Sequence, residues 1–301
     1  MRYTIFKDTR VGARSYNQDR MGFWSEGEAL MLALADGMGG HARGELAAQI
    51  AIDCIGAAFR VEAKPRVPDP GAFLPRAIQR AHAMIVHQGR KLGLPDMPRT
   101  TVVACVLQGG YAWWSFVGDS RLYLIRDGRV VTRTRDHTVV QQLVDAGRIR
   151  EEAVAVHPDR NKLLRCLGGP VAPRIDPTAT ARLTRDDLVL LCSDGLWGPL
   201  TQRQILNAVI GRDPDKALPE LVALAEKLGG ATCDNISVLA LQWLEEAVPP
   251  SEAEITVPLE PDTELRVAGA SAELMRLTDA DIERQIDEIK AALKKQDPEG
   301  R

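Results

Sequence analysis

The sequence predicts an α+β fold in which helices pack on largely antiparallel sheets. Two observations support this prediction. Apolar strands occur in pairs joined by two-residue turns, Gly109-Gly110 and Asp127-Gly128, which are typical of β-hairpins. Segments with helical periodicity are grouped together and do not follow each strand in turn. A doubly wound parallel sheet, which needs regular alternation of strands and helices, is therefore disfavoured.

The elements can be assigned in chain order from periodicity and turn residues. Helices are expected at 42–60, 71–92, 137–146 and 201–228, the last with an interruption near Pro214. Strands are expected within 101–118, 121–134, 188–195 and 235–244. The proline-containing stretch 64–70 separates the first two helices. These elements predict one folded domain at residues 1–244.

The chain is large enough for one large core or two modest ones, with 301 residues of which 45% are hydrophobic. Its 38 Lys and Arg nearly balance its 41 Asp and Glu. Nucleic acids and anionic membranes need a basic surface, so neither is expected as the main partner. The start, MRYTIFKDTR, does not resemble a signal peptide, and no segment is apolar over the length of a bilayer.

The cysteines give an expectation for the compartment. There are five of them, scattered along the chain and without a CxxC pair. We interpret them as buried free thiols, which persist in a reducing environment. A cytoplasmic protein is therefore expected.

The composition changes after Leu244. Residues 245–276 are acidic and proline-rich, which indicates a linker. Residues 277–301 are expected to form a helical tail, because Thr278 and Asp281 resemble a capping box. One apolar stripe follows, formed by Ile282, Ile286, Ile289 and Leu293. Two interpretations stay open: the helix packs on its own domain or frays, or it binds a partner or self-associates.

Residues 36–42 place an aspartate in a glycine-rich turn between an apolar run and a helix. Gly37, Gly39 and Ala42 match the G-x-G-x-x-G/A pattern of dinucleotide-binding loops. Asp36, however, would repel a pyrophosphate, and no second strand ending in an acidic residue follows the helix. A dinucleotide-binding protein is therefore kept only as a minor alternative.

Cys54 and Arg60 have the C-x₅-R spacing of cysteine phosphatases. Those enzymes need a loop of free backbone amides around the thiolate. Here the pair lies in the apolar helical stretch AIDCIGAAFR, whose amides are already hydrogen-bonded. We interpret the match as chance.

Aspartates recur where apolar strands end or begin. They are Asp36 after LALA, Asp119 after WSFVG, Asp194 after LVLLCS and Asp234 before NISVLALQW. Each alone is an ordinary turn or cap residue, as Asp127 is in its hairpin. If they meet at one sheet edge, each pair about 5 Å apart repels by about 3 kcal/mol at an effective dielectric near 20. Such a cluster requires cations, and all-oxygen ligands indicate Mg²⁺ or Mn²⁺ rather than Zn²⁺.

Five motifs, in this order, resemble those of the metal-dependent Ser/Thr protein phosphatases (the PPM, or type 2C, family), most of all its bacterial branch: RSYNQD, DGMGGHARGE, GDSRLYLIRDG, SDGLW and DNIS. The resemblance covers roughly residues 1–244 and not the tail. It implies a four-layer αββα sandwich with two antiparallel sheets. It also implies hydrolysis of phosphoserine and phosphothreonine by direct attack of a metal-bridging hydroxide, on phosphoproteins modified by a bacterial Ser/Thr kinase.

The resemblance assigns metal ligands to individual residues. Asp36 would bridge two Mn²⁺ or Mg²⁺ ions, and the Gly37 carbonyl would ligate one of them. Asp194 and Asp234 would complete the other. Asp119 with Asp194 would hold the third ion of bacterial members.

The resemblance also assigns residues around the ions. Arg14 would hold two phosphoryl oxygens through its planar guanidinium, so that Arg14 and Asp36 are the expected catalytic residues. Asp19, Gln18 and Asn235 would support the ligands from outside. Gln18 stands where many members have Glu, which is expected to lower metal affinity.

The general acid is not assigned. Met38 stands where eukaryotic members carry a His that is proposed to be the general acid. We expect no side chain of this chain, His41 included, to act as a general acid. His82 and His87 are expected to be partly exposed on the second helix. His137 and His157 fall in the segment that forms a mobile flap in this family, which is expected to set substrate preference. The non-enzymatic alternative is a pseudophosphatase that binds phosphoproteins, but the complete set of aspartates favours catalysis.

Overall fold

The computed structural model of the chain describes residues 1–38 and 43–246, which all belong to one compact unit. His41 of the glycine-rich loop lies outside the described residues. So do the predicted tail helix and all but the first two residues of the predicted linker. In the described part of the chain, no helix has the length and apolar character of a membrane span.

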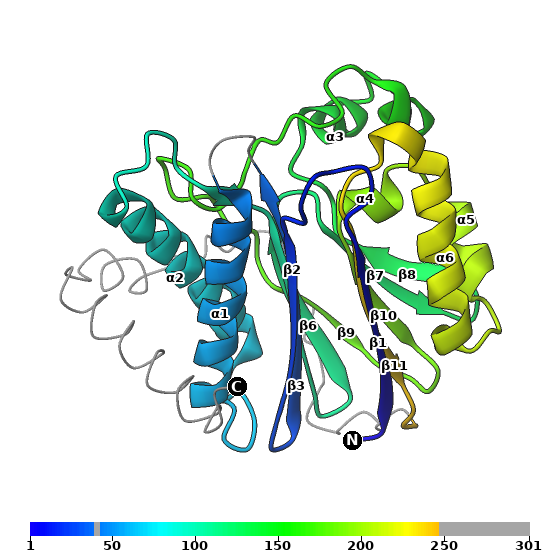
Figure 1. Ribbon diagram of the computed structural model, residues 1–301. Coiled ribbons are helices and arrows are strands. Elements are labelled where there is room, and N and C mark those ends of the chain that lie inside the picture. The colour runs from blue at the N-terminus through cyan, green and yellow to red at the C-terminus, as the bar shows by residue number, and fades with distance from the viewer. Residues whose placement is uncertain (39–42, 247–301) are drawn as a thin grey trace, which may run out of the picture. The chain divides into compact units, whose positions relative to one another are not determined.

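Two antiparallel sheets form the middle of this unit (Figure 1). The first has the strand order β1-β11-β10-β7-β8, with bounds Tyr3–Arg10, Ile236–Trp243, Leu188–Cys192, Arg121–Arg126 and Arg129–Arg133. The second has the order β2-β3-β5-β6-β9, with bounds Asp19–Glu26, Ala29–Met38, Val102–Gln108, Tyr111–Val117 and Ala179–Arg182, and the short strand β4 (Arg99–Thr100) also pairs with β3. The predicted α+β class with two antiparallel sheets is confirmed.

Helices cover the outer face of each sheet, which gives the expected αββα order of layers (Figure 1). On the second sheet lie α1 (Gly44–Glu62) and α2 (Pro70–Lys91). On the first lie α4 (Asp194–Trp197), α5 (Gln202–Val209) and α6 (Pro214–Gly229). The connection from β8 to β9 contains α3 (Val139–Asp145) and a 3₁₀ turn, η1 (Glu151–Val156), and a second turn, η2 (Gly230–Thr232), follows α6.

The alternation of side chains along each strand explains the two cores. Leu32 of β3 and Leu191 of β10 pack between the sheets, whereas Leu190 of β10 packs beneath α6. Because β10 is covered on both faces, its sequence LVLLC is apolar throughout. Burying such an aliphatic side chain contributes about 1.5–3 kcal/mol to stability.

Local sequence signals explain most element boundaries. The residues of both predicted two-residue turns have positive φ angles, as type I′ hairpin turns require: 56° and 79° at Gly109-Gly110, and 48° and 71° at Asp127-Gly128. Pro214 is the first residue of α6, so the predicted helix at 201–228 is two helices. The sequence did not predict β4 or β9, because strands of two and four residues are too short to show periodicity.

Two sequence interpretations change with the structure. The strand before the glycine-rich loop, β3, pairs antiparallel with β2 and β5, so the dinucleotide-binding alternative, which needs a parallel unit, is not favoured. The expectation that His82 is partly exposed is wrong. Its side chain is buried, and Nδ1 accepts a hydrogen bond from the Gly168 backbone N–H, 3.2 Å away, which satisfies this buried polar atom. His87 is partly exposed, as expected.

Candidate active site

The five aspartates of the predicted site come together at one end of the two sheets. Asp19 faces Asp36 across the β2–β3 pair. Asp194 follows β10 and Asp234 precedes β11, and these strands are neighbours. The other four carboxylates all act electrostatically on Asp36, including Asp119, which lies two residues after β6. The clustering expected from the sequence is therefore present.

Burial and mutual repulsion make this cluster costly when it is fully ionised. Burial, together with the neighbouring carboxylates, raises the pKa of Asp36 and Asp119 well above the usual range. The same causes raise the pKa of Asp19 to about 7 and that of Asp194 to about 6. One buried oxygen each of Asp19 and Asp194 has no hydrogen-bond partner among the described residues. Such a set of hard oxygen donors fits divalent cations.

Arg14 forms an ion pair with one member of this cluster, Asp234. Its Nε lies 2.8 Å from Asp234 Oδ1 and its Nη2 lies 2.6 Å from Oδ2, which is a bidentate ion pair. The Arg14 side chain is 59% exposed, so its outer edge is open to solvent. Among the described residues, no three Asp, Glu, His or Cys side chains form a ready set of metal ligands. The site therefore fits divalent cations by the chemistry of its carboxylate oxygens and not by a preformed coordination sphere.

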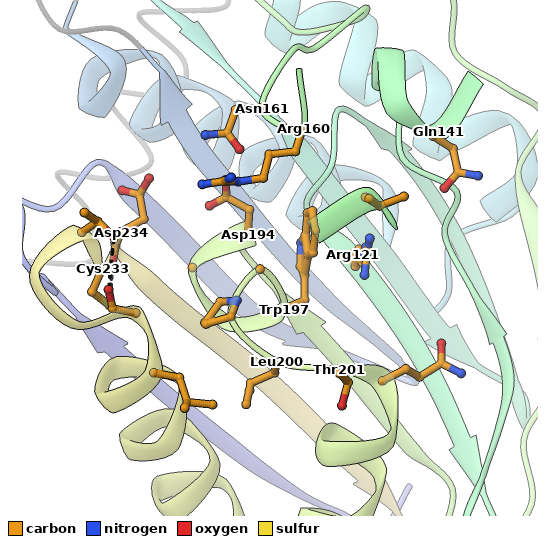
Figure 2. A pocket seen from close by; sticks show the side chains of 18 of the residues that line it. Arg121, Gln141, Arg160, Asn161, Asp194, Trp197, Leu200, Thr201, Cys233 and Asp234 are labelled. Atoms are coloured by element: carbon orange, nitrogen blue, oxygen red, sulfur yellow. Dashed lines mark hydrogen bonds between the residues drawn. The ribbon is translucent and has the colours of Figure 1, made fainter. Parts of the chain in front are cut away.

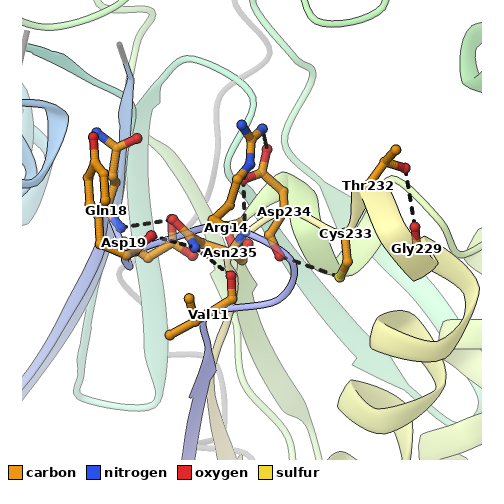
Figure 3. A network of polar contacts seen from close by, with 11 residues as sticks. Val11, Arg14, Gln18, Asp19, Gly229, Thr232, Cys233, Asp234 and Asn235 are labelled. Atoms are coloured by element: carbon orange, nitrogen blue, oxygen red, sulfur yellow. Dashed lines mark hydrogen bonds and ion pairs between the residues drawn. The ribbon is translucent and has the colours of Figure 1, made fainter. Parts of the chain in front are cut away.

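Asn235 holds the loop that carries Arg14 (Figure 3). Its Oδ1 accepts a hydrogen bond from the Gln18 backbone N–H at 2.8 Å. Its Nδ2 donates to the carbonyls of Val11 at 2.8 Å and Tyr16 at 3.1 Å. The amide thereby closes residues 11–18 into a fixed loop beside Asp234.

Two glycines bring the end of β3 into direct contact with the start of α1. A Cβ atom at Gly37 would lie 2.3 Å from the Gly44 carbonyl oxygen, and one at Gly44 would lie 2.6 Å from the Gly37 carbonyl carbon. Any side chain at either position would push the helix away from the strand. Gly37 and Gly44 are therefore explained by backbone packing, and the ligand role of the Gly37 carbonyl stays a prediction.

The turn that carries Asp119 is fixed by side chains that the sequence analysis did not assign. Trp197 Nε1 donates to the Asp119 carbonyl at 3.0 Å. His137 Nδ1 accepts from the Gly118 backbone N–H at 3.1 Å, and its Nε2 lies 3.0 Å from Asp176. Since Nδ1 accepts, the ring is neutral with its proton on Nε2, and burial lowers its pKa. His137 thus belongs to the packed base of the predicted flap.

A cleft of about 660 Å³ opens beside Asp194 and Asp234 (Figure 2). Its lining includes Trp197 and Leu200 after β10, and Arg160 and Asn161 from the segment between β8 and β9. The cleft therefore joins the carboxylate cluster to the segment that was expected to set substrate preference.

The cysteine-phosphatase interpretation is excluded by the position of Cys54. The thiol is buried within α1, and burial raises its pKa to about 11, so that it is protonated at neutral pH. All five cysteines are free thiols, and four of them are buried. None of them forms a disulfide that would stabilise the fold.

The fold and the acidic edge together define a class of phosphatases, those in which an αββα sandwich carries an aspartate cluster at one end of its sheets. The chain matches the family described as "Protein phosphatase 2C" over residues 9–230 and belongs to that family. The predicted membership is thereby confirmed.

Several relatives of this chain are bacterial proteins. It is 36% identical over 246 residues to the serine/threonine protein phosphatase PstP of Mycobacterium tuberculosis. The matched region covers 79% of this chain and 44% of that protein. It is 30% identical over 241 residues to the serine/threonine phosphatase stp of Listeria welshimeri, covering 79% of this chain and 94% of that one. The catalytic domain of PstP in complex with two manganese ions has a similar structure, with a TM-score of 0.68, 32% identity and coverage of 81% and 99%. The chain thus spans less than half of the mycobacterial protein.

Proposed function

We propose that this protein is a metal-dependent protein serine/threonine phosphatase that hydrolyses phosphoserine and phosphothreonine. The observation that carries the proposal is the cluster of five aspartates at the end of the two sheets, with Arg14 beside it. Membership of the protein phosphatase 2C family supports it. The full set of carboxylates argues against a pseudophosphatase, which needs no such cluster to bind a phosphoprotein.

Asp36, the Gly37 carbonyl, Asp194 and Asp234 would hold two Mn²⁺ or Mg²⁺ ions, and Asp119 with Asp194 a third. The unpartnered oxygen of Asp194 and the two manganese ions in the structure of PstP support this proposal. Bound at this site, such ions supply a nucleophile at neutral pH and neutralise the charge of the phosphoryl group.

Arg14 would bind the phosphoryl group. Its planar guanidinium already binds the two oxygens of Asp234 side by side, and two phosphoryl oxygens present the same geometry. Substrate binding and cation binding by Asp234 would therefore be linked, since release of Arg14 frees this carboxylate. Asn235 and Gln18 keep the loop in place while Arg14 changes partner. Asp19, held by the Ser193 hydroxyl at 2.8 Å, would support the ligands from behind.

The wider setting is also proposed. Phosphoproteins, modified by a Ser/Thr kinase that the phosphatase opposes, are the expected partners, supported by the names of the bacterial relatives. A cytoplasmic site of action is supported by the five free thiols.

Metal removal tests the proposed function. The purified protein is expected to hydrolyse an aryl phosphate and phosphothreonine peptides in Mn²⁺ or Mg²⁺ and to lose this activity in EDTA, with recovery when Mn²⁺ is restored. Alkylation of thiols in the presence of metal should leave turnover unchanged, because Cys54 is buried and protonated. Full activity in chelator would contradict the proposal.

A truncation tests the proposed domain boundaries. Removal of residues 245–301 is expected to leave turnover of a small substrate within a few-fold, because every proposed site residue precedes residue 236. Any effect should appear on a protein substrate or on self-association, measured by light scattering. An insoluble or inactive truncated protein would instead show that the tail belongs to the catalytic core.

A further inference from the structure

The ladder of backbone hydrogen bonds between β3 and the segment formed by β4 and β5 is irregular at Asp36. Pairing runs from Leu34 opposite Val103 to Gly37 opposite Thr100, so Asp36 faces Thr101. The Thr101 backbone N–H donates to the Asp36 carbonyl at 2.8 Å, as in a regular pair. The Asp36 N–H, however, donates to the Thr101 hydroxyl oxygen at 3.0 Å instead of to a carbonyl. A side chain therefore completes the backbone bonding of Asp36.

The same hydroxyl reaches the turn that carries Asp119. Thr101 Oγ1 lies 2.7 Å from Ser120 Oγ, and both residues are buried. Oγ1 accepts from the Asp36 N–H and still has a second lone pair and its own proton, so either of the two hydroxyls can donate to the other. The Thr101 side chain also packs against Gly118, where a Cβ atom would lie 2.6 Å from Thr101 Cγ2. One hydroxyl thus connects the backbone of Asp36 to the residue after Asp119.

We propose that Thr101 is a positioning residue whose hydroxyl fixes the spacing between Asp36 and Asp119, so that the ion proposed at Asp119 binds beside the ions proposed at Asp36. The inference rests on the metal-binding role proposed above for these two aspartates. Like charges repel, and only a fixed backbone keeps them close before cations bind. Supports of this kind set how well ligands are organised, and their loss typically costs about 10–100-fold in metal affinity or activity.

Thr101→Val removes the hydroxyl and keeps the shape of the side chain. We expect the Mn²⁺ concentration for half-saturation, measured by calorimetric titration, to rise about 10–100-fold, and kcat to fall over a similar range. KM for a phosphothreonine peptide should change less than about threefold, because Arg14 is untouched. Thr101→Ser keeps the hydroxyl and should restore both values. A serine variant as impaired as the valine variant would show that packing of the methyl group, not the hydroxyl, matters and would overturn the proposal.

Ser115→Ala is the matched control for loss of a buried hydroxyl. Ser115 lies in β6, the strand that leads to Asp119. Its Oγ forms a hydrogen bond of 2.9 Å with Thr178 Oγ1 and none with the aspartates of the cluster. We expect this variant to lose stability without any change in Mn²⁺ affinity. If Thr101→Val behaves in the same way as this control, Thr101 is merely structural and the proposal is wrong.

Ser120→Ala covers the case in which Thr101→Val does not fold. It breaks the connection to the Asp119 turn and leaves the Asp36 N–H bonded to Thr101. Mn²⁺ affinity should fall by at least about threefold, and unchanged affinity would overturn the proposal. The parent protein separates the two hypotheses. Absence of Mn²⁺-dependent turnover in the parent contradicts the proposed function, whereas an active parent with an equally active Thr101→Val contradicts the inference alone.

Discussion

Asp36→Asn is expected to lower kcat by roughly 10³-fold or more at any substrate concentration. The substitution keeps the size of the side chain and removes the charge proposed to bridge two cations. Changes to the partners of metal ligands already cost about 10–100-fold, so loss of the shared ligand itself should cost more. Steady-state kinetics and a calorimetric Mn²⁺ titration measure both effects. Near-normal turnover by this variant would show that the site is wrongly assigned.

The same substitution should stabilise the metal-free protein. Burial raises the pKa of Asp36, and four neighbouring carboxylates raise it further because they repel its charge, so a neutral amide relieves a cost that the folded state bears without cations. A relief of about 1 kcal/mol corresponds to roughly 2–4 °C in Tm for a domain of this size. A higher Tm of the metal-free variant together with a lower kcat would show that Asp36 has a functional role and that the loss of activity is not caused by misfolding.

Asp127→Asn is the matched control for Asp36→Asn. It makes the same chemical change in a hairpin turn where φ is 48°, a conformation that Asn tolerates. Neither kcat nor Mn²⁺ affinity should change. A comparable loss in this variant would indicate a general effect of net charge rather than a metal site.

The parts of the fold that were predicted are those with local signals. The hairpin at 121–134 follows from Asp127-Gly128, because that turn needs two residues that accept positive φ. The break at Pro214 follows from the missing N–H of proline. The αββα layering was not deducible from such signals and entered through the family resemblance, since how two sheets stack depends on contacts between residues far apart in the chain.

The site divides in the same way. Carboxylates at strand ends are visible because their chemistry is unusual beside apolar strands. The roles of Thr101 and His137 cannot be predicted from the sequence, because each side chain accepts a hydrogen bond from a backbone N–H. Thr101 accepts from Asp36 and His137 from Gly118. A hydroxyl or an imidazole that bonds a main-chain group leaves no pattern in the sequence. Only the register of β3 and the path of the Asp119 turn show which backbone groups they meet.

Arg14→Ala should lower kcat/KM by roughly 10–200-fold, the equivalent of one charge-assisted contact worth about 1.5–3 kcal/mol. A contact that is equally strong in the ground and transition states would raise KM alone. A contact that tightens as the phosphorus becomes trigonal would lower kcat as well. Arg14→Lys keeps the charge without the planar fork and should fall between the parent and the alanine variant.

The control for Arg14→Ala is Arg10→Ala, which removes another exposed arginine that binds an aspartate, Asp8, through two nitrogens. An exposed pair of this kind contributes about 0–1 kcal/mol to stability, so activity should not change. Mn²⁺ affinity is the more telling measurement for Arg14→Ala. Because Arg14 occupies the Asp234 carboxylate, its loss should leave the affinity unchanged or increase it. Weaker Mn²⁺ binding would mean that Arg14 organises the ligands instead of binding phosphate, and the assignment of the phosphate site would fail.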